Sequence, residues 1–264
     1  AAPDGTIYIV DAGNHRVQHF DAAGTFLRQW GTEGSGNGEF RGPFGVAVAP
    51  DGTVYVVEQS SRVQAFGPDG SFLRDWGSPG SSNGQFTLPH GIAVGPDGTV
   101  FVADTSNHRV QFFDPRGAYL GQWGSEGTGP GQFEGAQDIA VAKDNTVYVA
   151  DGLNHRIQFF TATGSYLGQW STQGEQASLG PFGAPAAVAT APGATTVYVT
   201  RLYEPNVLVL GVPGSFLTQW GSEGSDPGQM QTPSGVAVTA DGTVYVVDQG
   251  NNRIQAFCVG TGQM

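Results

Sequence analysis

Asp104, Asn107, His108 and Arg109 lie within six residues and combine a carboxylate, an amide, an imidazole and a guanidinium. Such a set could transfer protons, bind a metal ion or pair charges. The same pattern, however, recurs along the chain, with an acid followed by an arginine at Asp11/Arg16, Glu58/Arg62, Asp104/Arg109, Asp151/Arg156 and Asp248/Arg253. Because a guanidinium can bind a carboxylate and also reach turn carbonyls, we interpret these pairs as devices that fix a turn.

A sixth copy of the pattern is altered in a way that supports this interpretation. Arg201 stands where the other copies have an acid, and Glu204 lies inside the turn, so opposite charges stay close in reversed order. Three copies carry a histidine at equivalent positions, His15, His108 and His155. Since these histidines are spread over separate copies, we interpret them as turn residues and predict no metal site there.

The element that carries this pattern is a strand, a short turn and a second strand, as in Thr99–Phe113. The aromatic residue of the first strand recurs 46 to 50 residues apart, at Tyr8, Tyr55, Phe101, Tyr148, Tyr198 and Tyr245. A fixed period of 20–50 residues is typical of solenoids, propellers and arrays. We therefore expect one closed domain over 1–264, with repeats at about 1–44, 45–90, 91–137, 138–184, 185–234 and 235–264.

One repeat holds four short strands, here called a to d from the innermost outward. In the second repeat they are 45–49, 53–57, 62–66 and 71–76, joined by tight turns and followed by a longer Gly-rich d–a loop. One such antiparallel meander cannot bury both of its faces, whereas six packed radially can. The sequence therefore predicts an all-β, six-bladed β-propeller of four-stranded antiparallel blades. All five tryptophans end a strand d and are expected to pack between blades.

The first repeat lacks strand a and the last lacks strand d. An incomplete ring exposes unpaired strand edges, which proteins normally avoid. We therefore expect the chain to belong to a longer polypeptide whose flanking segment completes these blades; a neighbouring chain that supplies the strands is the alternative.

The triplets Asn14-His15-Arg16, Asn107-His108-Arg109 and Asn154-His155-Arg156, each followed by Val or Ile, Gln and an aromatic or His, resemble the NHL repeat. The linker from Trp123-Gly124 through Gly131-Gln132-Phe133 is similar to the linker of that family. The resemblance covers nearly the whole chain and implies a six-bladed β-propeller. It implies a broad range of functions, because the family includes protein-binding scaffolds, extracellular sensor domains, RNA binders and a few enzymes.

The residues just before each strand a are expected to point toward the mouth of the central channel, and they differ from repeat to repeat. Aligned on Ala-Val pairs, these mouth residues are Phe44, His90, Gln137, Ala184 and Ser234. Because the scaffold does not dictate them, we predict that Phe44, His90, Gln137 and Ser234 bind a ligand. No catalytic residue, cofactor or metal ligand is predicted.

Leu88-Pro89-His90-Gly91 resembles the motif by which the peptidyl-hydroxyglycine amidating lyase presents histidines to zinc. That site takes three histidines from different blades, and catalytic zinc needs three protein ligands. Here the other mouth residues are not histidines. We therefore favour a non-enzymatic binding or structural scaffold; the alternative is a metal-assisted enzyme at the mouth, of amidating-lyase or lactone-hydrolase type.

The net charge of the chain limits the classes of partner that it can bind. The formal net charge is −12, with one lysine and ten arginines, which opposes nucleic-acid binding, and no apolar run is long enough to insert into a membrane. Protein, peptide or glycan partners are expected, in an extracellular or cell-surface setting, with the cytoplasm as the alternative. The acids of the d–a loops are too scattered for a calcium site: Glu33, Glu39, Glu126, Glu134, Asp138, Glu175, Glu223 and Asp226.

Overall fold

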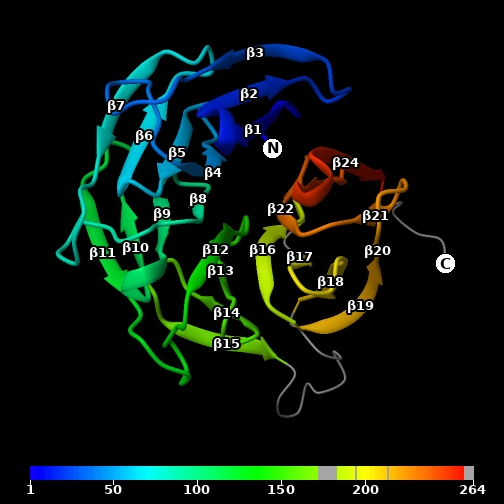
Figure 1. The fold of residues 1–264 in the computed structure, drawn as a ribbon. Coiled ribbons are helices and arrows are strands. Elements are labelled where there is room, and N and C mark those ends of the chain that lie inside the picture. The colour runs from blue at the N-terminus through cyan, green and yellow to red at the C-terminus, as the bar shows by residue number, and fades with distance from the viewer. Residues whose placement is uncertain (172–182, 194, 213, 259–264) are drawn as a thin grey trace. The chain divides into compact units, whose positions relative to one another are not determined.

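A computed structural model describes residues 1–171, 183–193, 195–212 and 214–258. The regular elements of these residues are β-strands and three-residue 3-10 turns, and the strands form six small antiparallel blade sheets. The chain divides into two compact units, unit 1 over Ala1–Ala136 and unit 2 over Gln137–Met264. Each unit holds three blades, which Figure 1 shows along the colour gradient. The predicted fold class, a six-bladed β-propeller, is confirmed.

Unit 1 contains blades 1 to 3. Blade 1 consists of β1 (Ile7–Asp11), β2 (Arg16–Phe20) and β3 (Phe26–Trp30). Blade 2 consists of β4 (Pro43–Val48), β5 (Val54–Glu58), β6 (Arg62–Phe66) and β7 (Phe72–Trp76). Blade 3 consists of β8 (Ile92–Val94), β9 (Val100–Asp104), β10 (Arg109–Phe113) and β11 (Tyr119–Trp123).

Unit 2 contains blades 4 to 6. Blade 4 consists of β12 (Ala136–Val141), which starts on the last residue of unit 1, β13 (Val147–Asp151), β14 (Arg156–Phe160) and β15 (Tyr166–Ser171). Blade 5 consists of β16 (Pro185–Thr190), β17 (Thr196–Arg201), β18 (Val207–Gly211) and β19 (Ser215–Trp220). Blade 6 consists of β22 (Pro233–Val238), β23 (Thr243–Asp248) and β24 (Arg253–Cys258).

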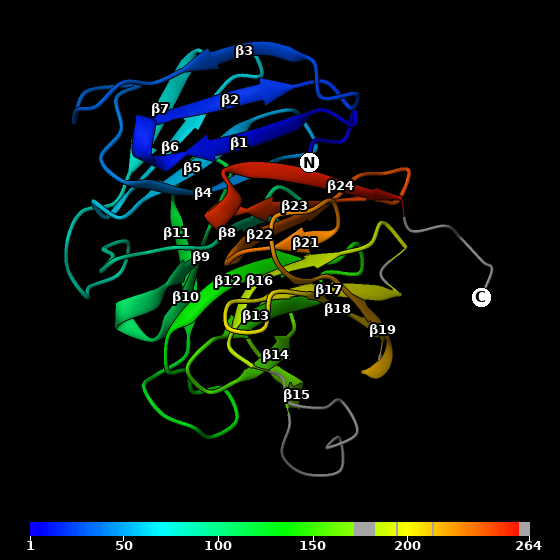
Figure 2. The same ribbon diagram turned by 45° about the vertical axis from the view of Figure 1, so that its right-hand side comes forward.

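Blades 1 and 6 are three-stranded in the part of the chain that the structure describes. Blade 1 has the order β1-β2-β3, and blade 6 has the order β22-β23-β24. Figure 2 shows β1, β2 and β3 side by side. By their place in the repeat, the described strands are b, c and d in blade 1 and a, b and c in blade 6.

The core of unit 1 forms where one blade faces the next. Trp30 of blade 1 lies 5.7 Å, between ring centroids, from Phe66 of blade 2, and Trp76 lies 5.7 Å from Phe113 of blade 3. Gly70, at φ 84°, leaves room for the Trp30 ring, since a Cβ there would lie 2.9 Å from it. Trp30 and Trp76 therefore pack between blades, as expected.

The long d–a loops carry an anchor that the sequence analysis did not predict. Four of these loops lie within the described residues, and each of the four closes on itself through a short parallel pairing: Glu33 with Phe40, Pro79 with Phe86, Glu126 with Phe133, and β20 (Ser222–Glu223) with β21 (Gln229–Met230). Phe40, Phe86, Phe133 and Met230 are fully buried. Burying a large apolar side chain stabilises each loop by about 2 kcal/mol, so the loops are firm supports for the side chains they carry.

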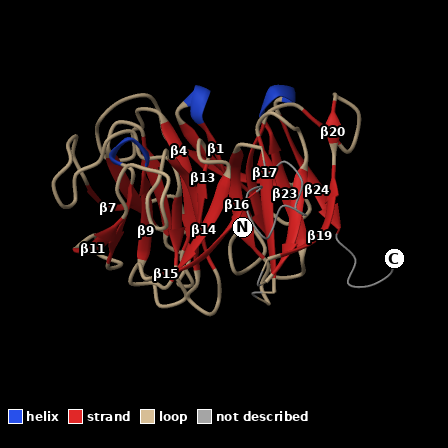
Figure 3. Cartoon of the chain, turned by 90° about the horizontal axis from the view of Figure 1, so that it is seen from below, coloured by secondary structure: helices blue, strands red, loops and turns tan. Residues whose placement is uncertain are grey.

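Short 3-10 turns connect strands b and c in three blades. They are η1 (Ala12–Asn14), η2 (Thr105–Asn107) and η4 (Gln249–Asn251), shown as blue segments in Figure 3. Among the described residues, no helix has the length and apolar character needed to cross a bilayer.

Candidate functional site

The acid–arginine pairs form a polar network that recurs from blade to blade, and blade 3 shows it in detail. Asp104 is completely buried, and its Oδ2 accepts hydrogen bonds from Arg109 Nε at 2.7 Å, from Asn107 Nδ2 at 2.9 Å and from Gln111 Nε2 at 3.1 Å. Its Oδ1 accepts from the Thr87 backbone N–H at 2.8 Å. A carboxylate with four donors has no capacity left for chemistry, so this network serves to position the turn.

In blades 2, 3 and 6, the arginine of the pair ties the b–c turn to the d–a loop that precedes the blade. Arg109 donates to the carbonyls of Ser81, Ser82 and Gln85 at 2.8 to 3.1 Å. The other acid-to-arginine contacts are similar: Asp11–Arg16 at 2.8 Å, Glu58–Arg62 at 2.8 Å, Asp151–Arg156 at 2.7 Å and Asp248–Arg253 at 2.7 Å. In blade 5, Arg201 forms an ion pair with Glu204 and donates to Asn206 Oδ1 at 2.7 Å, so the reversed order keeps the contact.

The histidines of the repeated triplet end these turns in an uncommon backbone conformation. His15, His108 and His155 have φ angles of 53°, 52° and 52°, in the left-handed region, and Asn252 has the same conformation in blade 6. Asn and His tolerate this region better than most residues. Within the described residues, no three His, Cys, Asp or Glu side chains gather in a way that could hold a metal ion.

The mouth residues of unit 1 occupy β-bulges. In blade 2, Pro43 pairs with Glu58 and Gly45 pairs with Val57, so Phe44 is an extra residue in β4. In blade 3, the His90 N–H donates to the Ala103 carbonyl and the Ala103 N–H donates to the Gly91 carbonyl, so His90 and Gly91 face one partner residue. A bulge re-aims a side chain at the end of a strand, which is how these two residues leave the regular sheet.

The bulges bring Phe44 and His90 together. Their rings stack with centroids 4.2 Å apart and an interplanar angle of 16°. Gln59, from the b–c turn of blade 2, places its amide Nε2 at 3.2 Å from His90 Nε2, and since an amide nitrogen donates, the imidazole nitrogen accepts. Phe44 remains 47% exposed and Leu88, beside His90, 50% exposed. Unit 1 therefore presents an aromatic platform whose histidine is oriented by a second blade.

In unit 2, strand register corrects one assignment. Pro185 pairs with Arg201 and Ala187 with Thr200, so the bulged residue of blade 5 is Ala186 and not Ala184. The sequence alignment took Ala187-Val188 as the reference pair, whereas register makes Ala189-Thr190 equivalent to Ala47-Val48.

The remaining mouth residues belong to blades 4 and 6. Ser234 is the bulged residue of blade 6, between Pro233 opposite Asp248 and Gly235 opposite Val247. Gln137, in β12, lies against Gly152, where a Cβ would come within 2.8 Å of the Gln137 Cγ. The structure thus unites Phe44 with His90 in unit 1 and places Gln137 and Ser234 in separate blades of unit 2.

Asp138 is the titratable residue that sequence reasoning missed. The sequence pattern places it among the acids of the d–a loops, but the structure places it in β12, at the position that Gly45 and Gly235 occupy in blades 2 and 6. Its Oδ2 accepts a hydrogen bond from the Val188 N–H of blade 5 at 3.0 Å. Burial raises the pKa of the Asp138 carboxyl to about 7. An acid at a glycine position of strand a was the available signal. Glu175 lies outside the described residues.

Comparison with known proteins agrees with this geometry. The NHL repeat model matches residues 1–20, 86–113, 133–160 and 230–257. A solved streptogramin B lyase is 15% identical, with 97% of this chain and 76% of that chain covered and a TM-score of 0.64. Virginiamycin B lyase from Staphylococcus aureus and its catalytically inactive variant with quinupristin are each 13% identical to this chain. Each match covers 99% of this chain and 83% of the other chain, with a TM-score of 0.66. At this identity the likeness concerns the fold.

Proposed function

Since this chain is an NHL-repeat β-propeller, we propose that it is a non-enzymatic binding module that recognises a protein, peptide or glycan through the face carrying its b–c turns and d–a loops. The net charge of −12 supports partners other than nucleic acid. The acid–arginine networks and loop anchors make that face a firm support, and its variable side chains supply recognition.

The observation that carries the proposal is the Phe44–His90 platform of unit 1. An aromatic side chain that is 47% exposed, stacked on a histidine and held by Gln59, contributes nothing to the turn network. Aromatic side chains provide large contact area at low entropic cost and are enriched at binding surfaces. Ordered loops beneath the platform lower the cost of ordering on binding.

Glycan and peptide arrays probed with the labelled protein test the proposal. Phe44→Ala should weaken the binding of array ligands at least tenfold, the effect of losing about 1.4 kcal/mol. Phe26→Ala is the matched control, because Phe26 is 50% exposed on the outer strand of blade 1. Ligands that bind the wild type and Phe44→Ala equally well would contradict the assignment of the site.

A second candidate is a metal-assisted enzyme of the lyase type, and one feature of unit 1 favours it. His90 offers an imidazole that Gln59 contacts at 3.2 Å, and a histidine is a common zinc ligand. Two structural neighbours are lyases by name. Zinc or calcium titration by calorimetry distinguishes the candidates: stoichiometric metal binding that His90→Ala abolishes would favour the enzyme over the binding module.

A further inference from the structure

The b–c turn of blade 2 is one residue shorter than its counterparts. Five residues run from Glu58 to Arg62, whereas six run from Asp104 to Arg109. In blade 3 the Asn107 Nδ2 fills the space between turn and loop, donating at 2.9 Å both to the Gly80 carbonyl and to Asp104. Asn251 does the same with Gly224 in blade 6. Blade 2 has no asparagine in this turn.

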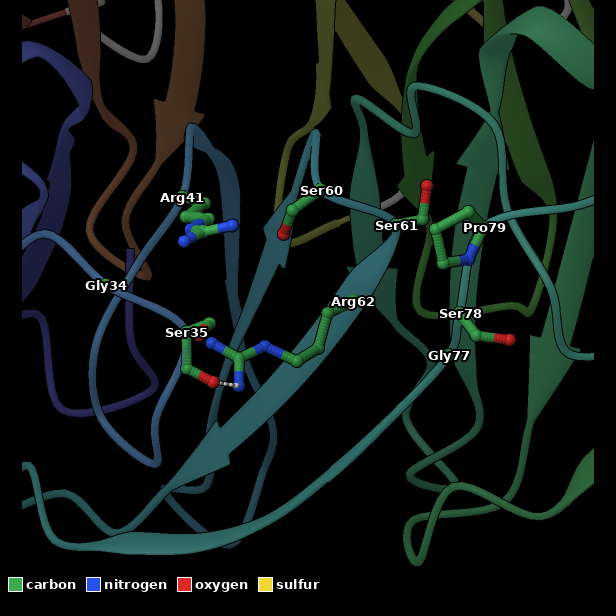
Figure 4. A pocket seen from close by; sticks show the side chains of 9 residues that line it. All are labelled: Gly34, Ser35, Arg41, Ser60, Ser61, Arg62, Gly77, Ser78 and Pro79. Atoms are coloured by element: carbon green, nitrogen blue, oxygen red, sulfur yellow. Dashed lines mark hydrogen bonds between the residues drawn. The ribbon is translucent and has the colours of Figure 1, made fainter.

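A pocket opens where that asparagine is absent. It has a volume of about 260 Å³ and is lined by Gly34, Ser35, Arg41, Ser60, Ser61, Arg62, Gly77, Ser78 and Pro79, all in unit 1 (Figure 4). Its walls are the d–a loop before blade 2, the shortened turn and the start of the next d–a loop. Arg41 occupies the position that the uncharged Thr87 has in blade 3 and Gln231 has in blade 6. In blade 2 the junction between the d–a loop and the b–c turn is therefore lined by a cation.

The two arginines of the pocket differ in what they can offer a ligand. Arg62 is fully engaged: its Nε donates to Glu58 at 2.8 Å and its terminal nitrogens donate to the carbonyls of Ser35 at 3.0 Å and Glu39 at 2.8 Å. Buried Glu58 offsets its charge. The exposed Arg41 uses its backbone N–H to bond Glu58 at 2.7 Å. Its guanidinium has no partner among the described residues.

The serine hydroxyls of the pocket, like the Arg41 guanidinium, can hydrogen-bond to a ligand. The Ser61 side chain is buried at 5% exposure, and its hydroxyl likewise has no partner among the described residues. The Ser60 hydroxyl lies 3.3 Å from Glu58 Oε2, beyond ideal range. The acids nearby are committed or peripheral, since Glu39 accepts the Gly36 N–H at 2.8 Å and Asp75 lies 3.6 Å from Arg62. One unpaired guanidinium among hydroxyls and carbonyls is a binding surface for a single planar carboxylate that carries further hydroxyl groups.

We propose that this pocket binds a terminal acidic sugar, a uronate whose carboxylate pairs with Arg41 and whose hydroxyls bond the serines and the Gly34 carbonyl. The volume is below the roughly 300 Å³ at which small-molecule sites begin, so it suits one sugar unit. Two arginines and four serines among the lining residues supply the hydrogen-bonding groups that would select a hydroxylated ligand. The net charge of −12 opposes a polyanion and permits a singly charged terminus. This inference rests on the proposed function, because it names the ligand chemistry of the same loop face.

Calorimetric titration of the whole protein with D-glucuronate tests the inference. Arg41→Gln should weaken binding at least tenfold, while Arg116→Gln, which changes an exposed arginine of blade 3 outside the pocket, should leave it unchanged. A second variant replaces Ser61 with Asn-His, restoring the six-residue turn; its asparagine should fill the pocket and abolish binding although Arg41 remains. Thermal melts verify that each variant folds.

Neutral and non-sugar probes complete the experiment. D-glucose and N-acetylglycine should each bind at least tenfold more weakly than glucuronate, because one lacks the carboxylate and the other the hydroxyls. Absence of glucuronate binding, equal affinity for N-acetylglycine, or unchanged affinity in Arg41→Gln would each overturn the inference. Array ligands that depend on Phe44 but not on Arg41 would overturn it while leaving the proposed function standing.

Discussion

The b–c turns of blades 2 and 3 both run from an acid to an arginine, but they differ by one residue in length and close their junctions with the d–a loop differently. In blade 3, an acid, an asparagine and an arginine close the junction with the d–a loop completely. In blade 2, the longer Glu58 compensates for a shorter turn and still reaches Arg62 and the loop, but the junction keeps a pocket. The repeated residues stabilise the scaffold. Positions where one blade differs from the others are free to bind a ligand.

The largest expected effect comes from breaking the complete network. Asp104→Ala leaves Arg109, whose side chain is 8% exposed, without its carboxylate. Removing one partner of a buried pair costs about 3–5 kcal/mol, and at about 2–4 °C per kcal/mol the melting temperature should fall by roughly 10 °C. Asp11→Ala, where the two side chains are 21% and 31% exposed, should cost about 1 kcal/mol. Equal losses in calorimetric melts would contradict the structural ranking of the pairs.

Asp138 provides a second comparison between blades, because blades 2 and 6 have glycine at the equivalent position of strand a. Burial raises its pKa from the ordinary 3.8 to about 7. The folded state therefore keeps its proton to higher pH than the unfolded state, and the stability from Asp138 is lost as pH rises from about 4 through 7. The stability of Asp138→Asn relative to wild type should increase over that range and level off above it.

The size of this effect is limited by partial exposure. A shift of this size corresponds to about 4 kcal/mol for a fully buried carboxyl, and because the side chain is only half-buried we expect about 1–2 kcal/mol between pH 4 and 8. Urea unfolding at a series of pH values measures it. Glu223→Gln, which changes an exposed acid, is the control; a pH-independent difference between Asp138→Asn and wild type would show that the pKa is not raised.

His19 of blade 1 departs from the phenylalanines that blades 3 and 4 carry at its position, Phe112 and Phe159. It is buried, it stacks on Tyr8 with ring centroids 4.0 Å apart, and neither ring nitrogen has a hydrogen-bond partner in the part of the chain that the structure describes. Burial, followed by the charge of Arg28, lowers its pKa. His19→Phe should therefore raise stability by about 1 kcal/mol, since an unsatisfied buried polar group is removed.

The pH dependence of His19→Phe provides its test. Because the folded-state pKa of His19 lies below the unfolded value of 6.5, protonation opposes folding as pH falls below 6.5. The gain from His19→Phe should thus be larger at pH 5 than at pH 8 in thermal melts. A gain that is absent at both pH values would mean that the imidazole nitrogens are satisfied in solution.

The sequence was sufficient for the architecture because strands b and c recur six times at a nearly fixed period, and each copy checks the others. It was insufficient where one copy deviates. The extra alanines of blade 5 shifted the predicted mouth residue by two positions to Ala184, and only pairing with Arg201 identifies Ala186. Asp138 looked like a loop acid because strand bounds are needed to place it in β12. The missing asparagine of blade 2 is visible in the sequence, but its consequence depends on where the Arg41 side chain lies.

The smallest expected effect concerns the backbone of the shortened turn. Ser61 has a φ of 72° at the position where His108 has 52° in blade 3. A left-handed conformation costs a non-glycine residue roughly 1 kcal/mol, and glycine avoids that cost while losing more entropy on folding. Ser61→Gly should therefore stabilise the protein by only a few tenths of a kcal/mol. Ser60→Gly, where φ is not positive, should destabilise it by about 0.5 kcal/mol, because only the entropy term remains. Equal shifts in calorimetric melts would indicate that the shorter turn stores no backbone strain and that its difference from blade 3 lies in the pocket alone.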